Sequence, residues 1–147
     1  MKKLFFLILV ICSTLVSCIS TKSTLKNVDN TAPKPVIKNN AFVITENTPE
    51  AKYGYHQDYP INLGFENEKL SEKNISLFFN ALSGKENQNF TYKKLEDCCP
   101  FPSKRNVMGA GMLSVYEITF QDTSTAKLYI NLFERGKVYC PKGFSIK

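Results

Sequence analysis

The sequence predicts an α+β fold, a small antiparallel sheet of about four to five strands with one amphipathic helix packed on a face. One stretch carries apolar residues at helical spacing, and several later stretches alternate apolar and polar residues between turn-forming segments. The chain has 147 residues, which suits one domain and is too short for a (β/α)₈ barrel.

The first residues are typical of a bacterial lipoprotein signal peptide. Lys2 and Lys3 precede an apolar run that is shorter than the roughly 20 residues of a membrane span. The run ends in Leu15-Val16-Ser17-Cys18, which resembles a lipobox. The resemblance implies a signal peptide over residues 1–17, cleavage before Cys18, diacylglycerol on its sulfur and a further acyl chain, such as palmitate, on the new amine. The alternative is an ordinary signal peptide whose cysteine is incidental.

A lipidated Cys18 would anchor the mature chain to a membrane, because two or more acyl chains hold a protein far more firmly than one. Ile19, and not an aspartate, follows it, which by the sorting rule of some Gram-negative lipoproteins points to the outer membrane, facing the periplasm. Loss of Lys2 and Lys3 lowers the formal charge from +6 to +4. This location suits an envelope protein or polymer as partner and excludes nucleic acid.

Residues 18–51 are predicted to be the lipidated cysteine and a flexible tether. Residues 19–40 are mostly Ser, Thr, Lys, Asn and Pro, which bury too little apolar surface to offset the entropy of ordering. Residues 41–45 are either a first short strand or an apolar spot in the tether. The compact domain is expected over residues 52–147.

The clearest helix signal lies in residues 66–83. Four apolar residues there have the spacing i, i+3, i+4 and i+7 that places them on one face. They are Ile75, Phe78, Phe79 and Leu82. Asn67 or Ser71 would cap the start, and Gly84 stands where a residue just past the helix end belongs.

Strands are expected on both sides of this helix. Residues 60–64 indicate a short strand before it. Period-two alternation predicts strands at residues 90–94, 112–120 and 127–132, with turns at 122–124 and 134–137. A last short strand is expected at 138–140, ended by Pro141 and Gly143.

Three cysteines remain once Cys12 is cleaved off and Cys18 is lipidated. In an oxidising compartment the simplest arrangement is a disulfide from Cys140 to Cys98 or Cys99, which leaves one thiol free. Two alternatives stay open. One is a vicinal Cys98–Cys99 disulfide acting in redox chemistry or binding, and the other is a set of reduced thiols.

Loop aromatics are the candidates for a binding surface. Five of them fall in predicted loops: Tyr53, Tyr55, Tyr59, Phe101 and Phe144. Aromatic residues in loops often form recognition surfaces, although in a small domain they also close the rim of the core. Lys93-Lys94 and Lys104-Arg105 are local basic clusters, which scattered solubilising charge also explains.

Catalytic, metal and cofactor sites find little support. With His56 as the single histidine and no G-x-S-x-G, a Ser-His-Asp triad has no basis. The cysteines lack both the paired spacing of a zinc site and the C-x-x-C of thioredoxin-like oxidoreductases. Gly109 and Gly111 precede a strand, whereas a phosphate loop precedes a helix. We therefore expect no catalytic residue, no metal and no cofactor.

Residues 52–147 also resemble a group of small bacterial envelope lipoproteins, most specifically at Cys98-Cys99-Pro100-Phe101. The other matching pieces are Tyr53-Gly54-Tyr55, Pro60-Ile61, Asn80-Ala81-Leu82, Gly109 and Gly111, Val115-Tyr116-Glu117, Leu128-Tyr129-Ile130-Asn131, Pro141 and Gly143-Phe144. Cys140 departs from the pattern, which weakens the idea that the cysteine pair exists to bond it.

Some members of this group carry the name 2-dehydro-3-deoxyphosphooctonate aldolase. We do not expect this activity here. An enzyme with it must bind two phosphorylated substrates, which favours arginines, and this chain has only Arg105 and Arg135. The sequence instead predicts a membrane-anchored, non-catalytic interaction module of unknown ligand. The alternative is a thiol/redox protein or enzyme that uses Cys98 and Cys99.

Overall fold

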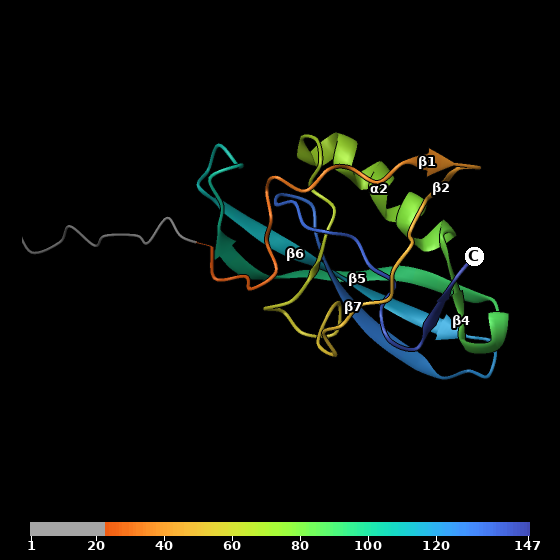
Figure 1. Ribbon diagram of the computed structural model, residues 1–147. Coiled ribbons are helices and arrows are strands. Elements are labelled where there is room, and N and C mark those ends of the chain that lie inside the picture. The colour runs from red at the N-terminus through yellow and green to blue at the C-terminus, as the bar shows by residue number, and fades with distance from the viewer. Residues whose placement is uncertain (1–22) are drawn as a thin grey trace, which may run out of the picture.

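The computed structural model describes residues 23–147 (Figure 1). The predicted signal peptide and the lipidation of Cys18 lie outside the described residues. Within the described part, one α-helix, a short 3₁₀ turn and eight strands follow one another. In chain order they are β1 (Ile37–Lys38), β2 (Ala41–Phe42), β3 (Ile61–Asn62), α2 (Glu68–Asn80), β4 (Leu82–Gly84), η2 (Lys85–Asn87), β5 (Phe90–Pro102), β6 (Ala110–Phe120), β7 (Thr125–Asn131) and β8 (Phe144–Ile146).

The main sheet has four strands in the order β3-β7-β6-β5, and β1–β2 and β4–β8 form two small separate pairs. The α+β class is confirmed, although strands dominate. The sheet is not wholly antiparallel, because β3 runs parallel to β7 with Ile61 opposite Ile130. A helix and two long strands separate β3 from β7 along the chain, so no tight turn fixes their relative direction.

Helix α2 lies across one face of the sheet (Figure 1). It begins after Asn67, whose side chain accepts a hydrogen bond from the Leu70 backbone N–H at 3.1 Å. The predicted helix is too long at its C-terminal end, where the structure ends it at Asn80. Leu82 is buried, but it belongs to β4, which pairs with β8.

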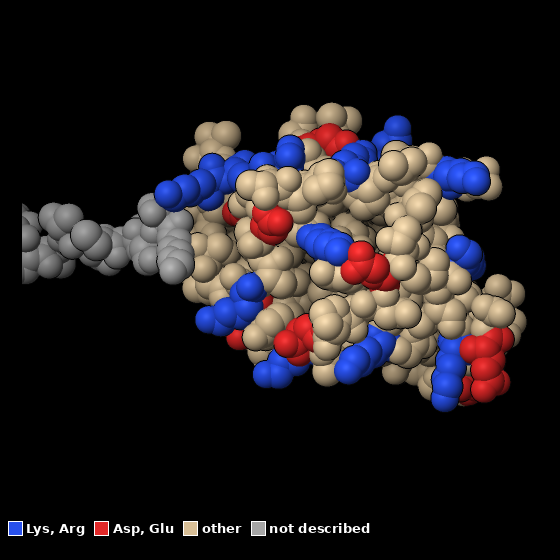
Figure 2. All heavy atoms as spheres, in the orientation of Figure 1, with Lys and Arg blue, Asp and Glu red and all other residues tan. Residues whose placement is uncertain are grey.

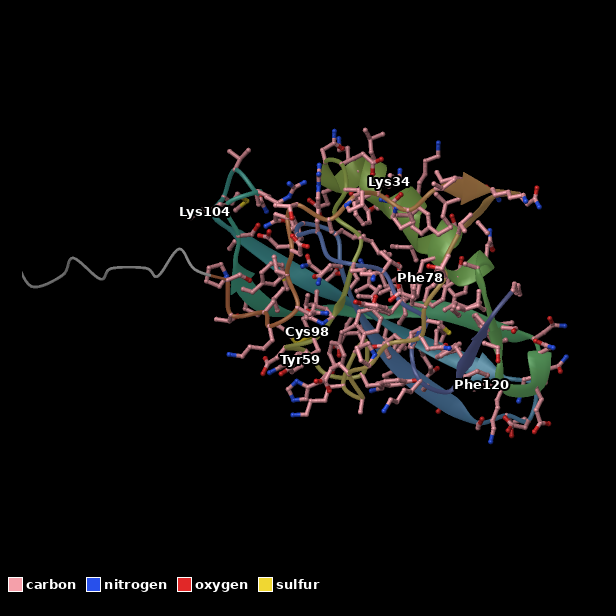
Figure 3. All side chains as sticks on the ribbon, viewed as in Figure 1. Lys34, Tyr59, Phe78, Cys98, Lys104 and Phe120 are labelled. Carbon is pink, nitrogen blue, oxygen red and sulfur yellow. A yellow bond between two sulfur atoms is a disulfide. The ribbon has the colours of Figure 1, made fainter. Side chains whose placement is uncertain are left out.

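The core lies between α2 and the sheet face turned toward it. Phe78, labelled in Figure 3, is fully buried on the underside of the helix. Its neighbour Phe79 stacks on Tyr92 of β5 with ring centroids 4.1 Å apart and also contacts Tyr116 of β6. These ring contacts fix the height of α2 above β5 and β6.

Residues 26–51 belong to the folded unit, so the prediction of a flexible tether over residues 18–51 and a domain that starts at residue 52 is wrong for this segment. Phe42 and Ile44 are buried in the core. The backbone of this segment bonds to distant segments, as Lys26 donates to the Asp58 carbonyl and Cys140 donates to the Glu46 carbonyl. Composition suggested too little apolar surface, but a few well-placed apolar side chains together with backbone hydrogen bonds dock the segment.

A row of hydrogen-bonded amide side chains, two of them fully buried, fastens this segment to the sheet. Asn131 of β7 donates to the side chain of Asn62 in β3 at 2.8 Å, and Asn62 donates to the Asn27 carbonyl at 3.0 Å. Asn27 in turn donates to the Pro60 carbonyl at 2.7 Å. Gly136 lies so close that an added Cβ would stand 2.8 Å from the Asn62 amide nitrogen. We call Asn27, Asn62 and Asn131 the amide row.

The predicted strand at 138–140 and the hairpin turn before it are also wrong. Cys140 makes only an isolated bridge to Asn47, and the last strand, β8, comes after Pro141 and Gly143. Short alternation in a segment that crosses the molecule does not create a strand unless a neighbouring strand lies beside it.

Phe42→Ala tests whether the N-terminal segment is part of the fold. Phe42 is 3% exposed, so the truncation should lower the free energy of unfolding by about 3–5 kcal/mol. Urea unfolding followed by far-UV circular dichroism measures it. The control Val36→Ala, at a side chain that is 71% exposed, should change stability by less than about 0.5 kcal/mol. Equal, small effects of both changes would show that the segment is a tether after all.

A candidate binding groove

The long hairpin β5–β6 reaches beyond the helix and carries two irregularities. The first lies between Lys94, opposite Tyr116, and Glu96, opposite Val115. Asp97 then pairs with Ser114, which shares a face of β6 with Tyr116. Because Leu95 is an extra residue at this bulge, Lys94 and Asp97 lie on the same side of the sheet although they are three positions apart.

The second irregularity contains the two adjacent cysteines. Cys98 lies opposite Leu113 and Phe101 opposite Gly111, so β5 again has one residue too many. Cys99 has φ +56°, and Pro100 offers no N–H, which a bulge on an edge strand tolerates. Cys98 and Cys99 form a vicinal disulfide, within a strand where a loop was expected. Figure 3 shows Cys98 on the hairpin.

Cys140 does not pair with either of them, so the arrangement expected first is wrong. It is a free cysteine, fully buried in the core, and its sulfur faces the Pro141 carbonyl oxygen at 3.6 Å. Burial raises the pKa of its thiol to about 11. Cys140 is therefore a small apolar core residue.

A groove of about 460 Å³ lies between the start of α2 and the hairpin. A second hollow of about 330 Å³ shares four residues with it, Glu72, Lys94, Ser114 and Leu132, so the two form one continuous groove along the helix. We call it the α2–hairpin groove. Its first part is lined by Glu68, Glu72, Lys94, Asp97, Pro100, Asn106, Met108, Ala110, Gly111, Met112, Ser114, Leu132 and Phe133.

Polar contacts on the groove floor fix one carboxylate. Ser114 donates to Asp97 at 2.7 Å, and the Lys94 ammonium lies 2.7 Å from the same oxygen. The Lys94 contact, followed by the Ser114 hydrogen bond, lowers the pKa of Asp97 below its ordinary value, against a partial desolvation that raises it. Asp97 is thus a carboxylate whose position and negative charge are both stabilised by its neighbours.

The tip of the hairpin is pinned to the rest of the fold. Arg105 donates through Nε to the Phe133 carbonyl at 2.7 Å and through a terminal nitrogen to the Gly64 carbonyl at 2.9 Å. Ser103 donates at 2.6 Å to the buried Glu134 carboxylate. Between these anchors and β6, Val107 and Met108 are fully solvent-exposed or nearly so, at 105% and 88%. A fixed loop that displays apolar side chains is typical of an interaction surface.

The predicted aromatic surface does not exist as such. Tyr53, Phe101 and Phe144 are buried, with exposures of 3%, 2% and 7%. Only Tyr55 and Tyr59 are partly exposed. Phe101 packs against the Phe133 ring across Gly111, where no side chain would fit, and Tyr53 accepts a hydrogen bond from the Tyr139 backbone. Tyr53, Phe101 and Phe144 therefore pack in the interior, with Phe101 in β5 and Phe144 in β8.

Sequence reasoning missed the groove residues Glu68, Glu72, Met108 and Met112. One signal was available: Val107-Met108 is an apolar pair inside an otherwise polar turn, residues 103–109. The charged residues on the visible face are of both signs, with a run of Lys and Arg atoms at the upper left and the two signs interspersed elsewhere (Figure 2). The Lys104-Arg105 cluster lies at the hairpin tip, where Figure 3 labels Lys104.

No protein-family model, curated protein or solved structure matches this chain. Over residues 23–147 no helix is long and apolar enough to cross a membrane. In that same part of the chain, no three side chains of His, Cys, Asp or Glu are grouped so that they could hold a metal ion.

Lys94→Met tests the charge arrangement on the groove floor. The pKa of the Asp97 carboxyl, measured by carbon-detected NMR titration, should rise toward its ordinary value because the first cause of its lowering is removed. Lys93→Met is the matched control, since Lys93 pairs with Glu117 at 2.8 Å on the other face of the sheet, and should leave Asp97 unchanged. An unchanged Asp97 titration in both variants would contradict the bulge geometry.

The lowered pKa of Asp97 also predicts how the stability difference between wild type and Lys94→Met depends on pH. Asp97 has a lowered pKa in the folded state, so its interactions stabilise the fold fully above the ordinary aspartate value. That contribution is lost as pH falls from there through the lowered value. The stability difference between wild type and Lys94→Met should therefore shrink over this acidic interval.

Proposed function

We propose that this protein is an envelope lipoprotein, anchored through acyl chains on Cys18, whose folded part is a non-catalytic binding module. The lipobox residues Leu15-Val16-Ser17-Cys18 and the resemblance of residues 52–147 to small envelope lipoproteins support the anchor and the location. The proposed site is the outer membrane, facing the periplasm, and the proposed partner is an envelope protein.

The observation that carries the binding role is the α2–hairpin groove. Its volume of about 460 Å³ falls within the range of small-ligand sites. It combines apolar side chains with a few fixed polar groups, and Met108 and Met112 stand exposed at its rim. Methionine side chains adapt to different partners, which makes them common on binding surfaces.

The polar groups in the groove favour binding over turnover. A general base works best when its pKa is close to the working pH, whereas the pKa of Asp97 is lowered further from neutrality. The Ser114 hydroxyl donates a hydrogen bond to that carboxylate, and the one histidine of the chain, His56, does not line the groove. The Asp97–Ser114 pair therefore provides fixed hydrogen-bonding groups at the bottom of the groove.

Site-specific photocrosslinking in cells tests both parts of the proposal. A photoreactive residue at Met108 of the lipidated protein should give a discrete crosslinked species. The same residue at the exposed Gln121, at the opposite end of β6, should give none. The species should disappear when Met112→Asp places a charge in the groove, and Cys18→Ala should move the protein out of the membrane fraction.

Two outcomes would count against this function. Crosslinks that are identical from positions 108 and 121 would mean that the groove has no special role. A Cys18→Ala protein that stays in the membrane fraction would show that the anchor is elsewhere.

The alternative is a thiol/redox role for Cys98 and Cys99. The vicinal disulfide between them supports this alternative. In that role, Cys98→Ser would abolish function while leaving the fold intact, whereas a binding module would keep its crosslink from position 108. The cysteine pairing itself is checked by alkylating the unfolded, unreduced protein. Among the three cysteines of the domain, only Cys140 should be labelled; labelling of all three would show that the Cys98–Cys99 disulfide, which favours this alternative, is absent.

A further inference from the structure

The two walls of the α2–hairpin groove differ in character. The helix wall carries Glu68 and Glu72, and the hairpin wall carries Met108 and Met112, with Phe133 beside them. Between the walls, the one lysine of the groove is already paired with Asp97 at 2.7 Å. The groove therefore presents two carboxylates on one side and apolar surface on the other.

Glu68 and Glu72 have no ion-pair partner within residues 23–147. They stand four positions apart on α2, where like charges repel and destabilise a helix slightly. Glu68 lies in the first turn, so the helix dipole accounts for it, but Glu72 lies beyond the reach of that effect. Neither an ion pair nor the helix dipole therefore accounts for the Glu72 carboxylate, in a chain whose net charge is positive.

We infer that the groove takes a cationic amphipathic segment of a partner protein, with basic side chains against Glu68 and Glu72 and apolar side chains against Met108, Met112 and Phe133. This rests on the proposed function and names the chemistry of its ligand. An amphipathic segment laid in a groove presents one charged and one apolar edge, which is the pattern of the two walls. An anionic headgroup or phosphate is disfavoured, because three carboxylates face a single lysine.

The test uses a displayed library of random dodecapeptides panned against the lipidated full-length protein in a neutral detergent. Peptides that combine Lys or Arg with apolar residues should be enriched, and affinities of the best ones are then measured by fluorescence anisotropy. Glu68→Gln with Glu72→Gln should weaken their binding about tenfold or more in low salt. Raising the salt concentration to about 0.5 M should remove most of that difference, because screening weakens exposed charge pairs.

The matched control is Glu86→Gln, an exposed carboxylate in η2 near the other end of β5, which should leave affinity unchanged. Met108→Ser should weaken binding by removing apolar contact. Circular dichroism of each variant checks that α2 is intact.

The outcomes separate this inference from the proposed function. Enriched peptides that bind in the groove, as shown by loss on Met112→Asp, but lack basic residues or ignore Glu68→Gln with Glu72→Gln would overturn the inference and leave the binding module standing. Peptides that bind but are insensitive to Met108→Ser and Met112→Asp would overturn both. No enrichment at all would overturn the inference alone, because photocrosslinking from position 108 tests the binding module separately. Binding of isolated amine-bearing wall polymer in the groove in place of peptides would also overturn the protein-segment assignment.

Discussion

The amide row holds together parts of the chain that are far apart in sequence. Asn131 at the end of β7 meets Asn62 of β3, and Asn62 meets the backbone of Asn27 in the N-terminal segment. Asn131 also accepts hydrogen bonds from the backbone N–H groups of Phe133 and Glu134. The buried amides of Asn62 and Asn131 have their hydrogen bonds met in this register, which favours it over others. The side-chain oxygen of Asn27 has no hydrogen-bond partner within residues 23–147.

The hairpin depends on that same row. Asn131 accepts hydrogen bonds from Phe133 and Glu134, which come shortly after β7. In this position the Phe133 carbonyl accepts from Arg105 and the Glu134 carboxylate accepts from Ser103. Asn30, from the N-terminal segment, donates to the second oxygen of Glu134. The tip of the β5–β6 hairpin is therefore fixed by polar contacts on one side, which leaves its apolar residues free on the other. The open groove is a result of where these hydrogen bonds lie.

Much of the fold could be predicted because it follows local periodicity. The buried face of α2 with Ile75, Phe78 and Phe79, and the alternation along β6 and β7, are set by neighbours in sequence. The rest depends on contacts that no short window contains. The pairing of Leu82 with Ile146, the docking of Phe42 and the amide row all join segments separated by many residues.

The candidate site was harder to predict for the same reason. Lys94 and Asp97 share a side only because β5 bulges, and a bulge is a property of the register with β6. Loop aromatics such as Phe101 looked available because loops were expected where β5 continues as a strand. The cysteine pair was recognised as one possibility, but its location within an edge strand could not be read from spacing.

If the protein is anchored through Cys18, the docked N-terminal segment limits how far the folded part can stand from the membrane. Lys26 already bonds to the Asp58 backbone, so if Cys18 carries the anchor, seven residues lie between the two and the chain makes eight Cα–Cα steps. Even fully extended they reach only about 28 Å. In Figure 1 the described chain begins at the same end of the molecule as the tip of the β5–β6 hairpin. With so short a linker, the groove would lie close to the lipid headgroups, within reach of partners that are themselves membrane-bound.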